Sequence, residues 1–235
     1  MLYDNFINMT IYSAEDLKKN AALKAASFVE DGMLVGLGTG STAKYAVEEV
    51  GRRIATGEIK VFGTPTSFAT LKLAKELEIP LKDLEEIQDG EIDIDIDGAD
   101  QIDLKTGTCL KGGGGAHYWE KKVARKSKQI IVIVDETKVV KNFAGYKVPL
   151  EIDNEKRELL ESSFADLGLQ LTFRESMSDS NNYVADTIYD GSIDLLEFEK
   201  KLLAVDGVLD TGVFHGLVTK IIVAKTNGEV DVIDL

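Results

Sequence analysis

The stretch Met33-Leu-Val-Gly-Leu-Gly-Thr-Gly-Ser-Thr42 combines an apolar run with a turn that is rich in glycine. Its first half, residues 33–37, is apolar apart from one glycine and predicts a short buried strand. Its second half, residues 38–42, contains only glycine and hydroxyl residues, and a helical pattern follows to about Ala55. A strand, a tight glycine turn and a helix in this order predict the first half of a β-α-β unit.

The same alternation continues on both sides of this stretch, as far as about residue 147. Helices are expected over residues 13–31, 42–55, 67–77 and 117–127. Strands are expected over residues 33–37, 60–63, 91–96 and 129–134, with a hairpin over 103–110. Strands that alternate with helices of this length predict a largely parallel sheet.

The pattern changes after about Lys147. Strands over 148–152, 169–173, 183–188 and 208–213, with helices over 155–167 and 194–204, give the order β-α-β-β-α-β. That order is typical of a ferredoxin-like unit. Two more strands, 217–224 and 230–233, flank an Asn-Gly turn and are expected to return to the first sheet. The prediction is an α/β protein with a Rossmann-like, mostly parallel sheet domain (1–146 and 215–235) and an inserted small α+β, ferredoxin-like domain (147–214).

Composition excludes several classes of function. The 235 residues carry a net charge of −14, which argues against nucleic acid or an anionic membrane as partner. Cys109 is the only cysteine, so no intrachain disulfide is possible, and we expect a cytoplasmic protein. Without a Cys-x-x-Cys pair or a Cys/His cluster, we expect no metal. Residues 1–9 do not read as a secretion signal, and Met9 is an alternative start.

The turn at residues 38–42 is a candidate phosphate site. Free N–H groups at the start of a helix attract anions, and the hydroxyls of Thr39, Ser41 and Thr42 can add hydrogen bonds. The alternative is a tight turn with an ordinary helix cap. The turn is not a Walker P-loop, because the Gly-Lys-Ser/Thr ending is missing. It is also a poor dinucleotide fingerprint, because no acidic residue follows the next strand.

Two charged stretches lie close together further along the chain: Asp97-Gly-Ala-Asp100 and Lys111-Gly-Gly-Gly-Gly115, the second followed by Glu120. Asp97 and Asp100 follow a predicted strand, and open α/β sheets bind ligands at that end of their strands. Paired acids near a lysine can bind sugar hydroxyls and keep the lysine charged. The alternative is a common Asp-Gly turn.

Lys111 and the four glycines that follow it are the most specific indication of a catalytic site in this sequence. A cation beside the bare N–H groups of Gly112, Gly113 and Gly114 can stabilise an enediolate or another oxyanion. The alternative is a flexible surface loop, although glycine linkers usually contain serine and lie between domains. Glu120, in the first turns of the next helix, can serve as a general base. A glutamate is also common there because it interacts favourably with the helix dipole.

Four other residues have less specific surroundings. His117 is a second candidate for the base, or simply the start of the helix. Cys109 is expected to be a small buried residue. Lys138, at the end of the most apolar strand, either reaches a phosphate or is solvated. Asp95 alternates with isoleucines, as its neighbour Asp93 does, which predicts a half-exposed strand face.

Five motifs in register resemble the A-type ribose-5-phosphate isomerases: residues 36–42, 97–100, 111–114, 120–121 and 135–138. The resemblance covers nearly the whole chain. It implies an α/β domain interrupted by a small α+β domain, a sugar-phosphate substrate, no metal or coenzyme, and homodimers or homotetramers. Within the small domain, Ser178-Asp-Ser-Asn-Asn182 departs from the family's usual Thr-Asp-Asn-Gly-Asn.

The resemblance also implies roles for individual residues. Glu120 is the base that moves a proton between C1 and C2 of the open-chain sugar. Lys111 binds and polarises the sugar oxygens and assists ring opening, together with Asp97 and Asp100. The substrate pocket is lined by Lys18, Thr39, Gly40, Ser41, Thr42, Gly112, Gly113, Gly114 and Lys138.

Two rival classes share this architecture. A non-catalytic sugar-phosphate sensor would carry a DNA-binding module, for which this chain has no room, and would be expected to lack Glu120 or Lys111. An acyl- or CoA-transferring enzyme would instead use a glutamate to form a thioester, which hydroxylamine or borohydride traps.

Overall fold

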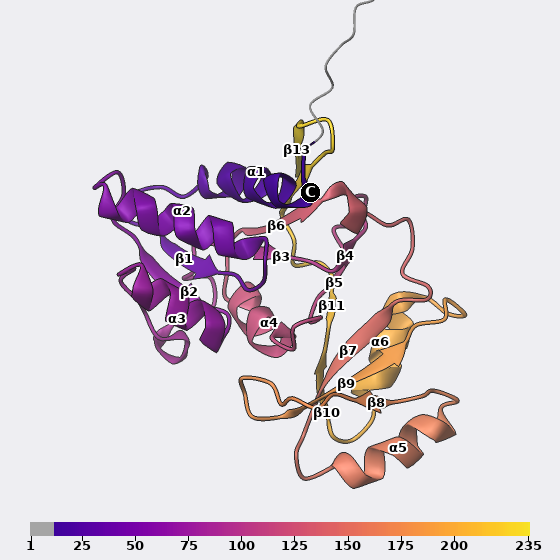
Figure 1. Cartoon of the computed structure of the whole chain (residues 1–235). Helices are drawn as coiled ribbons and strands as arrows, with labels where there is room; N and C mark the ends of the chain where they lie inside the picture. The colour runs from indigo at the N-terminus through magenta and orange to yellow at the C-terminus, as the bar shows by residue number, and fades with distance from the viewer. Residues whose placement is uncertain (1–11) are drawn as a thin grey trace, which may run out of the picture.

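A six-stranded sheet forms the centre of the larger part of the molecule (Figure 1). The computed structural model describes residues 12–235, so residues 1–11, with the alternative start Met9, lie outside it. The strand order is β13-β12-β6-β3-β1-β2, and every neighbouring pair is parallel except β12 and β13. The strands are β1 (Leu34–Leu37), β2 (Phe62–Pro65), β3 (Ile94–Gly98), β6 (Ile130–Asp135), β12 (Lys220–Ala224) and β13 (Val230–Asp234).

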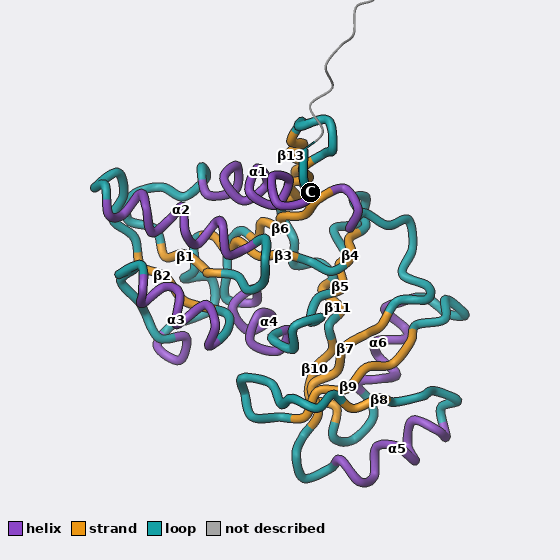
Figure 2. The backbone as a smooth tube through the Cα atoms, viewed as in Figure 1, coloured by secondary structure: helices purple, strands orange, loops and turns teal. Residues whose placement is uncertain are grey.

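Helices cover both faces of this sheet (Figure 2). Ile131 and Ile133 of β6 face a core shared with α1, α2 and α3, whereas Ile130 and Val132 face a core that includes α4. The helices are α1 (Ala14–Ala26), α2 (Ala43–Ala55), α3 (Phe68–Glu76) and α4 (His117–Arg125). Because both faces are buried, β1 and β6 are almost entirely apolar rather than alternating. Strand β3 is the exception, with Asp95 and Asp97 alternating with its isoleucines.

The start of α1 follows from its sequence. Ser13 and Asp16 form a capping box, in which the Ser13 hydroxyl accepts from the Asp16 N–H and the Asp16 carboxylate accepts from the Ser13 N–H. Small buried residues, including Ala21 and Ala25, then let α1 lie close against β6 and β12. The predicted cap is confirmed, whereas the helix ends at Ala26, before the predicted end at residue 31.

A four-stranded antiparallel sheet forms the second part of the molecule, at the bottom of Figure 1. Its order is β10-β7-β9-β8, which is the ferredoxin-like arrangement expected for β-α-β-β-α-β. The elements are β7 (Lys147–Ile152), α5 (Arg157–Asp166), β8 (Thr172–Phe173), β9 (Tyr183–Ile188), α6 (Leu195–Leu203) and β10 (Val208–Thr211). This sheet has its own apolar core, which includes Phe164 and Leu202. The predicted fold class is confirmed, whereas the exact domain boundaries stay a prediction.

A small third sheet contains the predicted hairpin, whereas the pairing of this hairpin with residues 213–214 was not predicted. The sheet has the order β11-β5-β4, with β4 (Gln101–Ile102), β5 (Cys109–Leu110) and β11 (Val213–Phe214). The strand predicted over 208–213 divides at Gly212 into β10 and β11. A Cβ at Gly212 would overlap the carbonyl oxygen of Lys111, and the Lys111 N–H donates to the Gly212 carbonyl at 2.9 Å. The chain therefore passes from the four-stranded sheet into the third sheet directly beside Lys111.

Other differences from the predicted elements concern their ends. Strand β2 begins two residues later than expected, and β3 covers Ile94–Gly98 because Ile92 pairs instead with the segment after α4. Two short 3-10 helices, Leu84–Glu86 and Glu136–Lys138, complete the elements. Within residues 12–235, no helix has both the length and the apolar character needed to cross a membrane.

Candidate active site

A cavity of about 140 Å³ lies where the loops after β1, β3 and β6 meet. Parallel strands end at one edge of their sheet, which is where an open α/β sheet binds ligands. The structure brings most of the predicted site residues together there. The lining residues are Thr39, Gly40, Ser41, Thr42, Gly98, Ala99, Asp100, Lys111, Gly112, Gly113, Gly114, Glu120 and Lys138.

Lys111 lies between two carboxylates. Its Nζ is 3.1 Å from Oδ2 of Asp97 and 3.1 Å from Oε2 of Glu120, and it donates to the Gly98 carbonyl at 2.6 Å. All three charged side chains are at least 94% buried, and the ring of Phe214 lies 5.4 Å from the ammonium. One ammonium shared by two ionised carboxylates leaves a net negative charge in a buried site, which favours uptake of a proton.

The proton is expected on Glu120. Burial, assisted by the negative charge of Asp97, raises the pKa of Glu120 to about 8, although Lys111 opposes the rise. Burial acts against the charge of Lys111, but the two carboxylates outweigh it and raise the pKa of the ammonium. Glu120 can therefore give and take a proton near neutral pH while Lys111 stays charged, as a general base needs.

Asp97 does not line the cavity but lies behind Lys111. Its Oδ1 accepts from the N–H groups of Thr39 at 2.9 Å and Gly98 at 2.7 Å, which leaves Oδ2 for the ammonium. Gly38 passes so close to Asp97 that a Cβ there would overlap the carboxylate. Asp97 thus holds both Lys111 and the turn after β1 in place.

The turn at residues 38–42 opens α2 with free donors. Within the described chain, the N–H groups of Gly40, Ser41 and Thr42 donate to no protein acceptor. The Thr39 hydroxyl points elsewhere, into a hydroxyl cluster with Thr66 at 2.7 Å and Ser67 at 2.8 Å. It therefore supports the turn rather than offering a free group. The helix end has the arrangement that binds phosphate.

The two predicted lysines lie in different places. Lys138 follows β6 and lines the cavity, as expected of a phosphate-binding lysine. Lys18 is on α1, 3.8 Å from Glu15, and is not among the residues that line the cavity. The structure does not bring Lys18 into the site.

The glycine loop (residues 111–115) forms another wall. Asp100 accepts the Gly113 N–H at 2.7 Å, and Gly115 donates to the Gly112 carbonyl at 2.9 Å. Within residues 12–235, the N–H groups of Gly112 and Gly114 have no protein acceptor. Arg174, which follows β8 of the four-stranded sheet, donates to the carbonyls of Gly112 and Gly113. Sequence reasoning missed Arg174, because it lies about 60 residues away and no local motif marks it.

The prediction for Asp95 was wrong. Its side chain is 1% exposed, because α4 covers the face of the sheet on which it lies. Among residues 12–235, Oδ1 has no hydrogen-bond partner, and it lies so close to Gly36 that a Cβ there would overlap it. Burial, together with Asp97, raises the pKa of Asp95 to about 8. Alternation with isoleucine indicates an exposed face only where a sheet has one, and this sheet is covered on both sides.

His117 and Cys109 are buried outside the cavity. His117 begins α4, and burial, together with Lys121 and Arg174, lowers its pKa to about 3, so the ring is neutral. Neither ring nitrogen has a hydrogen-bond partner within the described residues. Cys109 is fully buried, as expected, and burial raises the pKa of its thiol to about 12. Neither residue competes with Glu120 for contact with a substrate.

No group of three or more His, Cys, Asp or Glu side chains is arranged to hold a metal ion in the part of the chain that the structure describes. The polar groups around the cavity are an acid with a raised pKa, a buried cation and free N–H donors, and Asp100 and Lys138 complete its charged lining. Chemistry of this kind belongs to enzymes that move a proton on a small anionic substrate.

Comparison with known proteins identifies the family within this class of enzymes. The family model for ribose 5-phosphate isomerase A (phosphoriboisomerase A) matches residues 62–228. The ribose-5-phosphate isomerase A of Streptococcus pneumoniae (strain ATCC 700669 / Spain 23F-1) is 41% identical over 219 residues, which cover 91% of this chain and 95% of the relative. The chain belongs to the ribose 5-phosphate isomerase A family.

Solved structures agree with this assignment. The ribose 5-phosphate isomerase from Plasmodium falciparum superposes with a TM-score of 0.87 at 34% identity, covering 94% of this chain and 99% of that one. A D-ribose-5-phosphate isomerase in complex with phospho-erythronic acid superposes with a TM-score of 0.86 at 30% identity, covering 95% of this chain and 100% of that one. The family resemblance expected from the sequence motifs is confirmed.

Proposed function

We propose that this chain interconverts D-ribose 5-phosphate and D-ribulose 5-phosphate, with Glu120 as the general base. The observation that carries the proposal is the position of the Glu120 carboxylate, which lines the cavity 3.1 Å from the buried ammonium of Lys111. An aldose and a ketose differ only in where two protons lie. One base and one oxyanion site therefore suffice, and no redox partner is needed.

The reaction begins on the open-chain aldose, whose C2 proton is acidic because it lies next to the C1 aldehyde. Ionised Glu120 takes this proton, and the electrons of the C–H bond form a C1–C2 double bond, with negative charge on O1. Glu120 then returns the proton to C1, while a proton moves from O2 to O1. The product is the ketose, and the carboxylate is regenerated.

The negative charge of the enediolate requires donors that are already in place. The ammonium of Lys111 is held by Asp97 and Gly98, so it does not need to reorganise during the reaction. The free N–H groups of Gly112 and Gly114 add further donors. One donor of this kind is worth about 10²–10³ in rate. Asp100 uses Oδ2 on the Gly113 N–H, which leaves its other oxygen for a sugar hydroxyl.

The phosphate is expected at the start of α2. Gly40, Ser41 and Thr42 offer free N–H groups there, two of these residues add hydroxyls, and Lys138 adds a positive charge. The phospho-erythronic acid bound by a relative supports this class of ligand. Its carboxylate is planar and anionic like an enediolate, and its phosphate corresponds to that of the substrate.

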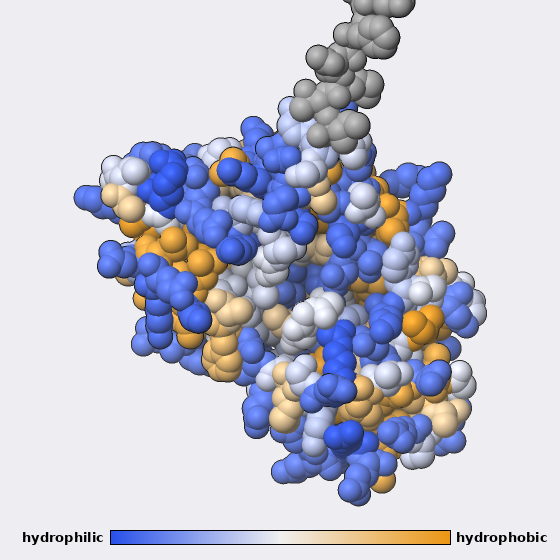
Figure 3. Space-filling view, in the orientation of Figure 1, coloured by the Kyte–Doolittle hydropathy of each residue, from blue (hydrophilic) through white to orange (hydrophobic). Residues whose placement is uncertain are grey.

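Assembly and location are part of the same proposal. We expect a homodimer or homotetramer, because the family resemblance implies one and because apolar side chains gather over β2 and α3 (Figure 3). Phe62 and Phe68, in these two elements, are each 55% exposed. The single cysteine favours the cytoplasm. No metal or coenzyme is required by the steps above.

A direct test follows ribose 5-phosphate carrying deuterium at C2 by NMR in ordinary water. Formation of ribulose 5-phosphate with part of the deuterium transferred to C1 supports isomerisation through one base. Absence of ketose would refute the function. Inactivation by hydroxylamine or borohydride in the presence of an acyl-CoA would favour the CoA-transferring alternative instead.

A further inference from the structure

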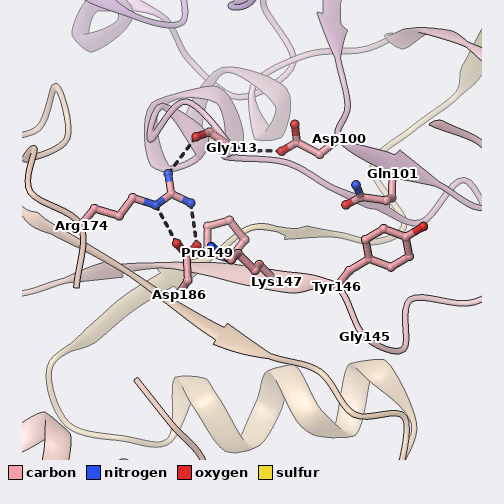
Figure 4. Close-up of a pocket in the computed structure, with 9 residues that line it drawn as sticks. All are labelled: Asp100, Gln101, Gly113, Gly145, Tyr146, Lys147, Pro149, Arg174 and Asp186. Carbon is pink, nitrogen blue, oxygen red and sulfur yellow. Dashed lines mark hydrogen bonds and ion pairs between the residues drawn. The ribbon is translucent and has the colours of Figure 1, made fainter. Parts of the chain in front are cut away.

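A second cavity, of about 540 Å³, lies between the two parts of the molecule and shares Asp100 and Gly113 with the catalytic cavity (Figure 4). Two charged groups that line it, Arg174 and Asp186, are paired with each other and do not await a ligand. In the close-up, the guanidinium lies between the Asp186 carboxylate and the backbone of the glycine loop. This arrangement suggests support of the loop rather than binding of a second molecule.

The hydrogen bonds of Arg174 are divided between two tasks. Nε donates to Oδ2 of Asp186 at 2.9 Å and Nη2 to Oδ1 at 2.6 Å, which is the bidentate geometry that fixes the plane of a guanidinium. Nη1 donates to the carbonyls of Gly112 at 2.7 Å and Gly113 at 3.1 Å. Asp186 therefore aims Arg174, and Arg174 holds two consecutive peptide groups of the glycine loop.

The effect on the active site follows from peptide geometry. In a trans peptide, the N–H of one residue points opposite to the carbonyl of the residue before it, and no peptide bond in the described chain is cis. Holding the Gly112 carbonyl directs the Gly113 N–H away from Arg174, onto Asp100. Holding the Gly113 carbonyl in the same way directs the N–H of Gly114, a cavity-lining residue, away from Arg174.

The loop needs such support from outside. Its four glycines have no side chains to fix their conformation, and Gly112 and Gly115 have φ values of +106° and +81°, which other residues rarely adopt. Among residues 12–235, the hydrogen bonds that hold the loop after Lys111, apart from the Gly115–Gly112 turn, come from Asp100 on one side and Arg174 on the other. Free glycine peptides would otherwise rotate, and the donors would lose their aim at the substrate.

We propose that Arg174, aligned by Asp186, is a positioning residue that aims the Gly114 N–H at the enediolate. The small sheet thereby contributes to catalysis without touching the substrate. This inference rests on the proposed isomerase function. A misplacement of about 1 Å in such a donor is enough to cost roughly 10²-fold in rate.

The test uses Arg174→Lys in the full-length protein. Lysine keeps the positive charge beside Asp186, so the buried carboxylate stays paired and the variant should fold. A single ammonium cannot bind Asp186 through two nitrogens and also hold two carbonyls. We expect kcat to fall about 10- to 100-fold, with KM changed less than about three-fold, because a transition-state donor is lost and ground-state binding is kept.

The matched control is Arg157→Gln. Arg157 is the first residue of α5, and its guanidinium stacks on Phe173 and Tyr183. Among the described residues, it makes no hydrogen bond or ion pair with the glycine loop. It should leave kcat unchanged. Arg174→Ala tests the idea independently of folding yield: guanidinium ion at millimolar concentration should restore part of kcat, and sodium chloride at the same ionic strength should not.

The outcomes are distinct. A wild-type protein without isomerase activity refutes the proposed function itself. If the wild type is active and Arg174→Lys keeps its kcat, the role of Arg174 is overturned. The same holds if Arg174→Lys shows a raised KM without loss of kcat. Loss of kcat together with rescue by guanidinium but not by salt supports it.

Discussion

Replacing Glu120 with glutamine should abolish turnover and at the same time stabilise the fold. Glutamine keeps the shape of the side chain but cannot accept the C2 proton, and a general base contributes about 10²–10⁴ to the rate. The site is occupied by a carboxylate that the fold does not favour, because burial raises the pKa of Glu120 from 4.5 to about 8. Removing its charge therefore removes a cost of folding.

The magnitude follows from the linkage between pKa and stability. The folded state binds a proton that the unfolded state has already released, so the free energy of unfolding falls as pH rises from about 4.5 to about 8. At pH 7 the difference is about 3 kcal/mol, because pH 7 lies 2.5 units above the pKa of 4.5 and each pKa unit corresponds to about 1.36 kcal/mol. Glu120→Gln should be more stable than wild type by up to that amount at pH 7, and equally stable below pH 4.5.

Urea denaturation at both pH values measures the stability change, and the ribulose 5-phosphate assay measures turnover on the same preparations. Asp210→Asn is the control of opposite sign. Burial would raise the pKa of Asp210, but Lys121, at 2.7 Å, outweighs burial and holds it below its usual value. Breaking this buried pair should cost about 3–5 kcal/mol while folded protein keeps its kcat. If Glu120→Gln is less stable than wild type, or if it turns over normally, the assignment of Glu120 is wrong.

Three further predictions concern the same site. Glu120 must be ionised to act, and burial raises its pKa to about 8. We therefore expect kcat/KM to fall about tenfold for each pH unit below pH 8. A kcat/KM that stays constant down to pH 5 would contradict this. Lys111→Ala should lower kcat by about 10²–10³, as expected for loss of an oxyanion donor, and steady-state kinetics with unchanged kcat would refute its role. Asp95→Ala should raise the free energy of unfolding above pH 4 and leave it unchanged at lower pH. The reason is that the raised pKa of Asp95 penalises the folded state only when the carboxylate is ionised in the unfolded state. A variant that loses stability at pH 8 would show that Asp95 is favourably paired.

Sequence patterns were sufficient to predict those parts of the fold and site that depend on residues close together in the chain. The apolar run and glycines of residues 33–42 predict a strand, a turn and a helix, and the carboxyl ends of parallel strands must meet at one edge. Asp100 follows β3 and Lys138 follows β6, so their approach to one cavity could be expected. The order of the small sheet's elements likewise limits its topology to a few arrangements.

Long-range contacts could not be predicted in this way. Arg174 reaches the glycine loop only because β8 and β9 place it there, and nothing in its neighbouring residues marks that contact. Lys18 has a helical position that allows either an exposed ion pair or a substrate contact, and only the packing of α1 decides between them. Asp95 was misjudged for the same reason, since the burial of its strand face depends on α4, a segment more than 20 residues away.

Neighbouring residues of α4 show how buried charges differ between structural and catalytic use. Lys121 lies between the carboxylates of Asp210 and Glu199, and Arg125 also pairs with Asp210, so two cations balance two carboxylates there. Glu120 shares Lys111 with Asp97, and the site is left with one negative charge too many. A fold that needed only a stable interior could balance this trio as it balances Lys121. Burial, together with this excess of negative charge, raises the pKa of Glu120 to about 8 at a cost in stability, and a base that exchanges protons near neutral pH requires that shift.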